Sequence, residues 1–406
     1  MKRNLVITIL LGVLYLLSGC SPECPDGICT PKLLWTQPLD GGKMNTTFAP
    51  IIYKDKVIYS RDVRTGEYTS KSRLRFLDKN TGNLRSEWND LLSDIDRLSY
   101  NGIKYVNNNL LIFSNNASVS VVDMDKESTQ FKTNNAQWCG VKDMVGLNEI
   151  VYHTESECDS VIEKEFIVEY NIATQKQRVV YSTTPKDENV RSMKTPKSYI
   201  NKVGDTVLVF NVNYYKSSPS ASNDGRLIAY NVTQKKEEYN EQLAVDSYAG
   251  FPALPLLYNG KVYMPFGKSI FCHDQFTGKQ LWRKFFTHVF LSSDPIIVEG
   301  KLYAACENER LYCLNLDTGD IIWETDGAGT PSDIVYMNGV IYFVGGGDGK
   351  LHAVDAVTGS HIWRFASPDL IKNENAYFQQ SIVADPSTNR IYTATYLNAM
   401  CFKAAR

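Results

Sequence analysis

The residues of this 406-residue chain best suited to catalysis or metal binding are its five histidines. They are His153, His273, His288, His352 and His361, and their spacing does not match that of zinc ligands. His273 and His352 fall in segments with β-strand character, where a hydrogen-bonded structural histidine is more common than a ligand. No serine can be grouped with a histidine and an aspartate into a defensible catalytic triad. The sequence therefore predicts no metal site, no cofactor and no catalytic centre.

Cys20 has a different chemistry, which depends on the residues before it. Lys2 and Arg3 precede an apolar run over residues 5–17, which ends in Leu17-Ser-Gly-Cys20. The run is shorter than the roughly 20 residues of a membrane-spanning helix, so residues 1–19 are predicted to be a secretory signal. The last four residues resemble the lipobox of bacterial lipoproteins, which implies cleavage before Cys20 and lipidation of its thiol. The alternative is an ordinary signal with a chance cysteine.

Export would leave eight further cysteines in an oxidising compartment, where disulfides are permitted but their connectivity cannot be read from sequence. Cys306 and Cys313 flank a predicted hairpin turn, so this pair is a possible disulfide. Weaker alternatives are Cys24 with Cys29 and Cys139 with Cys158. Alignment of the repeats described below places three thiols in a small inward slot that alanine fills in other units, which favours a packing role. These three are Cys272, Cys313 and Cys401, and the corresponding alanines are Ala229 and Ala353.

Four tryptophans could provide a platform for a sugar or a quinone, but they recur periodically. Trp282, Trp323 and Trp363 lie about 40 residues apart, and each follows a Thr-Gly pair. This period is typical of one four-stranded propeller blade. The tryptophans and the glycines of the Thr-Gly pairs are therefore predicted to pack the blades together. They are Trp35, Trp282, Trp323, Trp363, Gly82, Gly278, Gly319 and Gly359.

The same period extends over the rest of the chain and predicts an all-β fold. A polar residue closes the third strand of each unit, and Asn259-Gly260, Glu299-Gly300 and Asn338-Gly339 mark the preceding hairpins. The closing residues are Asp78, Asp123, Asn171, Asn231, Asp274, Asn315, Asp355 and Lys403. Eight such positions predict an eight-bladed β-propeller of four-stranded antiparallel blades.

Both ends of the chain fit this count. The eighth unit ends at Arg406 without a fourth strand, and Lys32-Leu-Leu-Trp35 supplies an unassigned strand at the start. We therefore expect the N-terminal strand to close the last blade, because closure removes exposed sheet edges. The domain plan is then a signal peptide over 1–19, a lipidated tether over 20–31 and a propeller over 32–406.

The charge balance gives no electrostatic basis for two classes of contact. The chain has 43 basic and 45 acidic residues, so its composition indicates binding neither to nucleic acid nor to an anionic lipid surface.

The repeat Leu-x-Ala-x-Asp followed by Thr-Gly and Trp, as in 351–363, resembles that of the pyrroloquinoline-quinone-like (PQQ-like) propellers. Combined with a lipobox, it resembles propeller lipoproteins of outer-membrane β-barrel assembly. This resemblance implies a non-catalytic protein-binding scaffold, lipid-anchored in the cell envelope, with an envelope or outer-membrane protein as partner.

The alternative is a quinoprotein-type dehydrogenase, or a propeller that binds a small ligand or glycan in its central channel. Many quinone enzymes of this group carry adjacent cysteines, and this chain has no such pair. No convergent set of carboxylates for a calcium ion is evident either. Whether the channel takes a small molecule is left open by the sequence.

Three predicted connections between second and third strands are longer than the others: 63–72, 155–165 and 213–224. Strands of a blade alternate in direction, so all three must emerge on the same face of the disc. They carry candidate partner-binding residues of types enriched at protein interfaces. These are Arg64, Tyr68, Lys71, Tyr214, Tyr215 and Lys216. The alternative is that long loops are simply tolerated here, because insertion costs little entropy.

Overall fold

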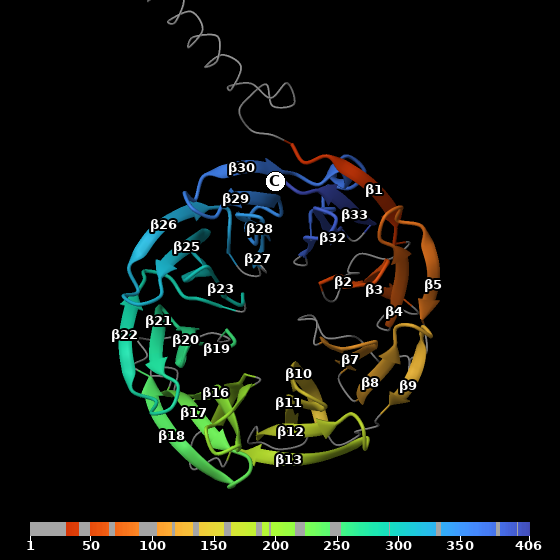
Figure 1. Ribbon diagram of the computed structural model, residues 1–406. Coiled ribbons are helices and arrows are strands. Elements are labelled where there is room, and N and C mark those ends of the chain that lie inside the picture. The colour runs from red at the N-terminus through yellow and green to blue at the C-terminus, as the bar shows by residue number, and fades with distance from the viewer. Residues whose placement is uncertain are drawn as a thin grey trace, which may run out of the picture.

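The computed structural model describes most of the chain from residue 30 onward. The described ranges are 30–39, 49–64, 70–88, 104–115, 118–132, 138–157, 164–183, 189–194, 196–215, 224–243, 253–291, 293–329, 334–378, 382–395 and 397–406. They form eight antiparallel sheets arranged as a ring around a central axis (Figure 1). The predicted eight-bladed propeller is confirmed. Among the described residues no helix is long and apolar enough to cross a membrane.

Each blade has its first strand next to the axis and its fourth strand at the rim (Figure 1). Blade 1 contains β2 (Ile51–Tyr53), β3 (Lys56–Arg64), β4 (Ser70–Asp78) and β5 (Leu84–Trp88). Blade 2 contains β6 (Lys104–Asn107), β7 (Leu110–Asn115), β8 (Ser118–Asp123) and β9 (Ser128–Lys132). Blade 3 contains β10 (Trp138–Leu147), β11 (Ile150–Glu157), β12 (Glu165–Asn171) and β13 (Lys176–Ser182). Blade 5 contains β19 (Leu256–Tyr258), β20 (Lys261–Phe266), β21 (Ser269–Asp274) and β22 (Gln280–Phe285).

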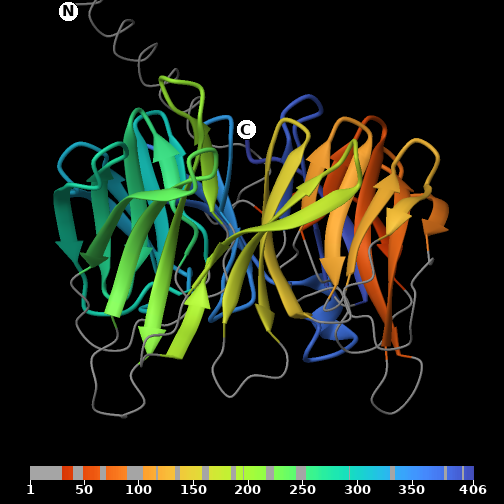
Figure 2. The ribbon, with the colours of Figure 1, turned by 90° about the horizontal axis from the view of Figure 1, so that it is seen from below.

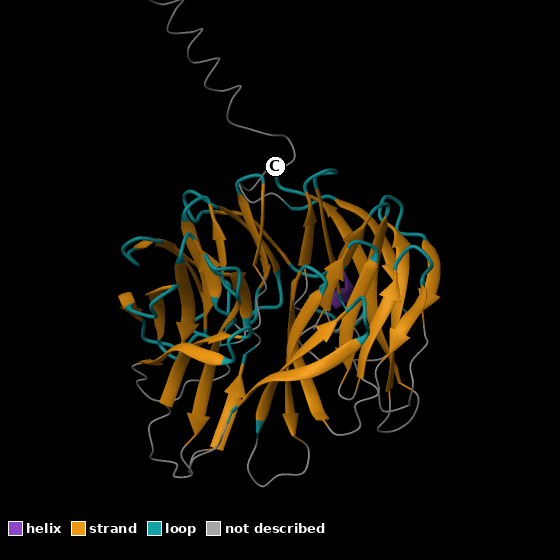
Figure 3. Cartoon of the chain, turned by 60° about the horizontal axis from the view of Figure 1, so that its bottom comes forward, coloured by secondary structure: helices purple, strands orange, loops and turns teal. Residues whose placement is uncertain are grey.

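Blades 6 and 7 follow the same order. Blade 6 contains β23 (Ile296–Val298), β24 (Lys301–Cys306), β25 (Arg310–Asn315) and β26 (Ile321–Asp326). Blade 7 contains β27 (Ile334–Met337), β28 (Val340–Val344), β29 (Leu351–Asp355) and β30 (His361–Phe365). The short 3-10 helix η1 (Pro368–Ile371), purple in Figure 3, leads to blade 8.

Blade 8 is closed by the N-terminal strand, as the sequence predicts. Its order is β1 (Leu33–Pro38), β33 (Asn398–Lys403), β32 (Arg390–Ala394) and β31 (Ile382–Asp385). Trp35 pairs with Cys401 across the two terminal strands, and the Lys403 amide donates to the Lys32 carbonyl at 2.9 Å. Both ends of the ring therefore lie on the same face of the disc, which we call the tether face (Figure 2).

Blade 4 departs from the predicted four strands. Its innermost strand is divided into β14 (Asn189–Met193) and β15 (Lys197–Ile200), which pair with the two halves of β16 (Thr206–Tyr215). Pro196 lies in the break and has no N–H to donate to the ladder. The blade is completed by β17 (Asp224–Asn231) and β18 (Lys236–Leu243).

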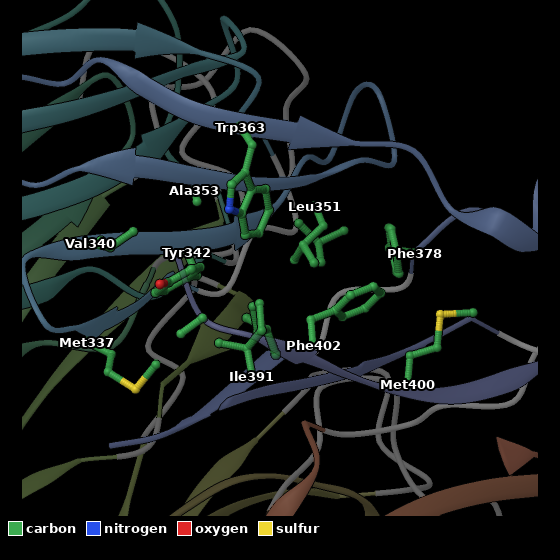
Figure 4. Packing of buried hydrophobic residues seen from close by; sticks show 13 residues of the cluster. Met337, Val340, Tyr342, Leu351, Ala353, Trp363, Phe378, Ile391, Met400 and Phe402 are labelled. Atoms are coloured by element: carbon green, nitrogen blue, oxygen red, sulfur yellow. The ribbon is translucent and has the colours of Figure 1, made fainter. Parts of the chain in front are cut away.

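The middle strands are apolar along their whole length because they are covered on both faces by neighbouring blades. In β28 all five residues are buried, and β20 is buried from Val262 to Phe266. Figure 4 shows one such inter-blade core, in which Trp363 and Tyr342 of blade 7 pack near Ile391 and Phe402 of blade 8. The hydrophobic core is thus a ring of clusters between blades, with no single centre.

The two faces differ in the connections that they carry. Turns between first and second strands and between third and fourth strands lie on the tether face. Connections between second and third strands lie on the opposite face, which we call the docking face, where β3, β11 and β16 end. The eight predicted closing residues, from Asp78 to Lys403, each end a third strand at the tether face.

Candidate functional site

The blades are joined by a repeated contact at the tether face, which we call the inter-blade clamp. Trp323 and Tyr303 of blade 6 both donate to the Ala356 carbonyl of blade 7, at 3.3 and 3.1 Å. Trp35 and Tyr392 of blade 8 donate in the same way to the Lys79 carbonyl of blade 1, at 3.1 and 3.2 Å. The same arrangement thus links blade 6 to blade 7 and closes the ring between blades 8 and 1.

Each clamp tryptophan rests on a glycine of the next blade. A Cβ atom on Gly82 would lie 2.6 Å from Trp35, and one on Gly319 would lie 2.7 Å from Trp282. Gly278 differs, because the ring above it is Tyr239. Trp363 is 2% exposed and packs within the core between blades 7 and 8.

The small inward slot lies between the clamp rings. Cys313 is paired with Tyr303 on one side and Trp323 on the other, and Ala353 is likewise flanked by Tyr342 and Trp363. A small side chain leaves room for the tyrosine and tryptophan to meet, with ring centroids 5.7 Å apart in blade 6.

We expect Gly359→Ala to destabilise the ring by about 1–3 kcal/mol, through backbone strain and a clash. Gly359 has a φ of 75°, and its Cβ would lie 2.7 Å from Trp323. Gly300→Ala is the matched control, because Gly300 has a φ of 74° but nothing within 4 Å of its Cβ. Urea unfolding of both variants measures the difference. Equal losses would show that the tryptophan contact contributes nothing.

The docking face is where the structure modifies the sequence prediction. Strands extend into all three of the expected loops: Arg64 ends β3 and Lys71 lies in β4, β11 continues to Glu157, and Tyr214 and Tyr215 end β16. Tyr214 pairs with Asp224 and packs partly against the core between blades 3 and 4, so it is not a loop residue. The cause is pairing, since β3 and β4 keep their ladder as far as Arg64 and Ser70.

Two of the six candidate partner-binding residues, Tyr68 and Lys216, lie outside the described residues, as does Cys20. For the other four, the structure gives a common location: the docking-face ends of second and third strands in blades 1 and 4.

Beneath this face, blade 3 holds a buried acid and base that the sequence analysis did not single out. His153 Nε2 lies 2.7 Å from Glu155 Oε1, and both side chains are fully buried. The two residues are two positions apart on β11, so their side chains lie on the same face of the strand. A histidine and a glutamate at this spacing in a predicted strand are the sequence signal that could have revealed the pair.

A second buried carboxylate ties blade 3 to blade 4. The Met193 amide at the end of β14 donates to Glu165 Oε2 at 2.7 Å. On the other side of blade 4, Asn211 Nδ2 of β16 donates to the carbonyl of Ala253, which precedes blade 5, at 3.1 Å. These groups are 0–1% exposed, and removing one partner of such a contact would leave an unpaired polar group. Blades 3 and 4 therefore present a rigid base at the docking face.

The remaining histidines have structural partners. His273 Nδ1 donates to the Gly278 carbonyl at 2.7 Å, and burial lowers the pKa of His273, which favours its neutral form. His352 lies 3.1 Å from Asp348 and stacks on Phe343, with centroids 4.7 Å apart. In the part of the chain that the structure describes, no three His, Cys, Asp or Glu side chains are placed to hold a metal ion.

The possible Cys306–Cys313 disulfide is not formed in the structure, where both thiols are free. Cys306 on β24 is opposite Arg310, and Cys313 is three residues further along β25, so the two face opposite sides of the blade. Cys306 packs between blades 5 and 6, and Cys313 between blades 6 and 7. Burial raises the pKa of each thiol to about 11, which disfavours the reactive thiolate. The two weaker pairings each include a cysteine outside the described residues.

Eight closed blades with this clamp define an eight-bladed PQQ-like propeller. The chain matches the family described as outer membrane protein assembly factor BamB over residues 171–363 and 249–406. These ranges together cover more than half of its length, so the chain belongs to that family.

Solved structures agree on the fold. The crystal structure of BamB from Moraxella catarrhalis is 13% identical, with a TM-score of 0.60, covering 92% of this chain and all of that one. Sqt1 from Saccharomyces cerevisiae is 9% identical, with a TM-score of 0.63, over 92% of this chain and 99% of that one. At such identities the likeness concerns the fold alone.

A curated relative comes from a different functional class. The dehydrogenase subunit of a quinone-type alcohol dehydrogenase from Gluconobacter oxydans is 34% identical over 82 residues. The match covers 17% of this chain and spans only 11% of the relative's length.

Proposed function

We propose that this protein is a non-catalytic scaffold that holds a protein partner at the cell envelope. Its membership of the family described as outer membrane protein assembly factor BamB carries the proposal. The partner is an envelope or outer-membrane protein, and the setting is outer-membrane protein assembly. A lipid on Cys20 would attach the ring to the membrane.

The docking face is the proposed contact surface. Among the connections between second and third strands, those of blades 3 and 4, over 158–164 and 216–223, are the longest, and that of blade 1, over 65–69, exceeds those of blades 2, 5, 6 and 8. Insertions on a rigid scaffold are a common location for binding residues. The buried pair His153–Glu155 and the Glu165–Met193 contact support two of these blades from below.

The match to a quinone-type dehydrogenase favours a second candidate function, but weakly. Its 82 residues correspond to about two blades, so the match is no longer than a pair of repeats. That repeat consists of strands, Thr-Gly turns and clamp tryptophans, which build the blades. Shared blades indicate a shared architecture and leave the activity open.

Shortening the three long connections should weaken partner capture at least tenfold while leaving the melting temperature nearly unchanged. The segments to replace with short Gly-Ser linkers are 65–69, 158–163 and 216–223, which leaves every paired strand residue in place. Pulldown from detergent-solubilised membranes measures capture.

The matched control replaces the five-residue turn 201–205 on the tether face with Asn-Gly, which should preserve capture. If the partner is still retained by the chain with all three connections shortened, the docking face is not the contact surface.

A further inference from the structure

Apolar side chains project from some turns of the tether face, where other blades have polar ones. The exposed residue at the tip of the third-to-fourth strand turn is Asn80 in blade 1, Asp125 in blade 2 and Asp317 in blade 6. The same position holds Phe276 in blade 5, 52% exposed, and Val357 in blade 7, 63% exposed. Nothing in the turn geometry requires this change, because all five turns bond to the residue that closes the third strand.

Blade 4 carries a third projecting residue. Its first turn is longer than the two-residue turns of blades 5, 6 and 7, and Val203 at its tip is 77% exposed. The turn is held rigid by Asn201, whose Oδ1 accepts from the Val203 and Asp205 amides at 3.1 and 2.9 Å. Val203 is therefore fixed in an exposed position by its own backbone.

Val203 and Phe276 border a shared apolar depression. An open cavity of about 320 Å³ lies between the two turns and is lined by both side chains and by Tyr199. Tyr199 and Phe276 are in edge-to-face contact, with centroids 5.9 Å apart. Asn201, Lys202 and Glu238 also line the cavity, and the long side chain of Lys202 can reach a charged surface beside an apolar one.

The position of these turns around the ring indicates the shape of the surface that they meet. Blade 4 is diametrically opposite blade 8, where the chain enters β1 through the half-exposed Leu33 and Leu34. Val357 lies in blade 7, beside that entry. Val203 in blade 4 and Val357 in blade 7 are three blades apart, and Phe276 in blade 5 lies between them along the ring. All three turns are on the tether face, so one flat surface could touch them together.

We propose that the tether face lies flat against a lipid bilayer, with Val203, Phe276 and Val357 inserted at the interface between headgroups and acyl chains. The chain enters β1 on this same face, so a lipid on Cys20, a short segment before β1, would direct the tether face toward a membrane; this step rests on the lipid anchor of the proposed function. Exposed lysines beside the tips, Lys202 and Lys279, suit anionic headgroups. The docking face is then turned away from the membrane, toward partners in solution.

Vesicle flotation tests this assignment without the lipid anchor. The chain from Ser21 contains the complete ring from β1 to β33, and it is mixed with vesicles of phosphatidylethanolamine and phosphatidylglycerol. We expect this chain to bind, and the double variant Val203→Asp/Val357→Asp to partition at least tenfold less. Val203→Phe should raise binding several-fold.

The matched control is Ile371→Asp, because Ile371 is 93% exposed in η1, outside the tether-face turns. It should bind vesicles like the parent, and all variants should melt like the parent because the changed side chains are at exposed positions. Absence of vesicle binding by the parent, or equal binding by the double variant, would overturn the membrane assignment. Neither result affects the scaffold proposal, which is tested by partner capture.

Discussion

Deleting Lys32 to Leu39 should abolish the stable monomeric ring, because these residues supply the outer strand of blade 8. The deletion removes Trp35 and Leu39, which are 8% and 0% exposed, and the clamp contact of Trp35 with Lys79. It also removes the Pro38 carbonyl, which accepts from Arg75 at 2.7 Å. Loss of a buried tryptophan alone typically costs about 3–5 kcal/mol, which is a large part of the 5–15 kcal/mol by which a domain is stable.

The deletion also creates an open sheet edge. Without β1, the outer edge of β33 from Asn398 to Phe402 would lose its ladder partner. Unpaired edges promote association between chains, so we expect aggregation as well as a lower melting temperature. Size-exclusion chromatography and thermal unfolding measure the two effects.

A deletion of the same length elsewhere provides the control. Removing the eight residues from Ser21 to Ile28 shortens the segment before β1 and leaves every described strand intact. This variant should melt like the parent. A β1 deletion that stays monomeric with an unchanged transition would show that the N-terminal strand does not hold the ring closed.

Cys20→Ser should move the protein from the membrane fraction to the soluble fraction or block its processing. The lipobox-like sequence would place the thiol of Cys20 for lipidation, and a serine side chain has no thiol. Fractionation, with mass spectrometry of the N-terminal peptide, measures the outcome.

Cys24→Ser is the matched control, since Cys24 lies only four residues later and has no lipobox before it. It should remain membrane-bound. A Cys20→Ser chain that is processed and stays membrane-bound like the parent would contradict lipid anchoring. If a small bound fraction persists, the tether-face variants should remove it, which separates the lipid from the apolar turns.

The sequence predicts the ring well because its turns have strong local signals. Asn259-Gly260 and Asn338-Gly339 adopt the positive φ angles that the pairs imply, and each closing polar residue ends a third strand. These signals arise within a few residues, and the closing residue recurs in all eight units, so a unit with a weak turn signal is identified by its place in the series. The small slot at Cys313 and Ala353 is also recoverable, because alignment of the repeats compares positions in equivalent surroundings.

The features that sequence reasoning missed depend on neighbours distant in the chain. The division of the inner strand of blade 4 into β14 and β15 appears only in how each half pairs with β16, although Pro196 offered a local hint. Extension of β16 to Tyr215 is set by its partner β17, which periodicity within one segment does not show. The exposure of Val203 and Phe276 requires the ring itself, because only the ring places their turns side by side on one face.

Site-specific photo-crosslinking in intact cells tests whether a protein partner docks on the face opposite the chain's entry into the ring. A photoreactive residue is placed at Tyr215, beside the docking-face connection of blade 4, and at Asn338, in a tether-face turn of blade 7. We predict a discrete protein adduct from position 215, identified by mass spectrometry as an envelope or outer-membrane protein, and none from position 338. A protein adduct from position 338 together with none from position 215 would contradict the account.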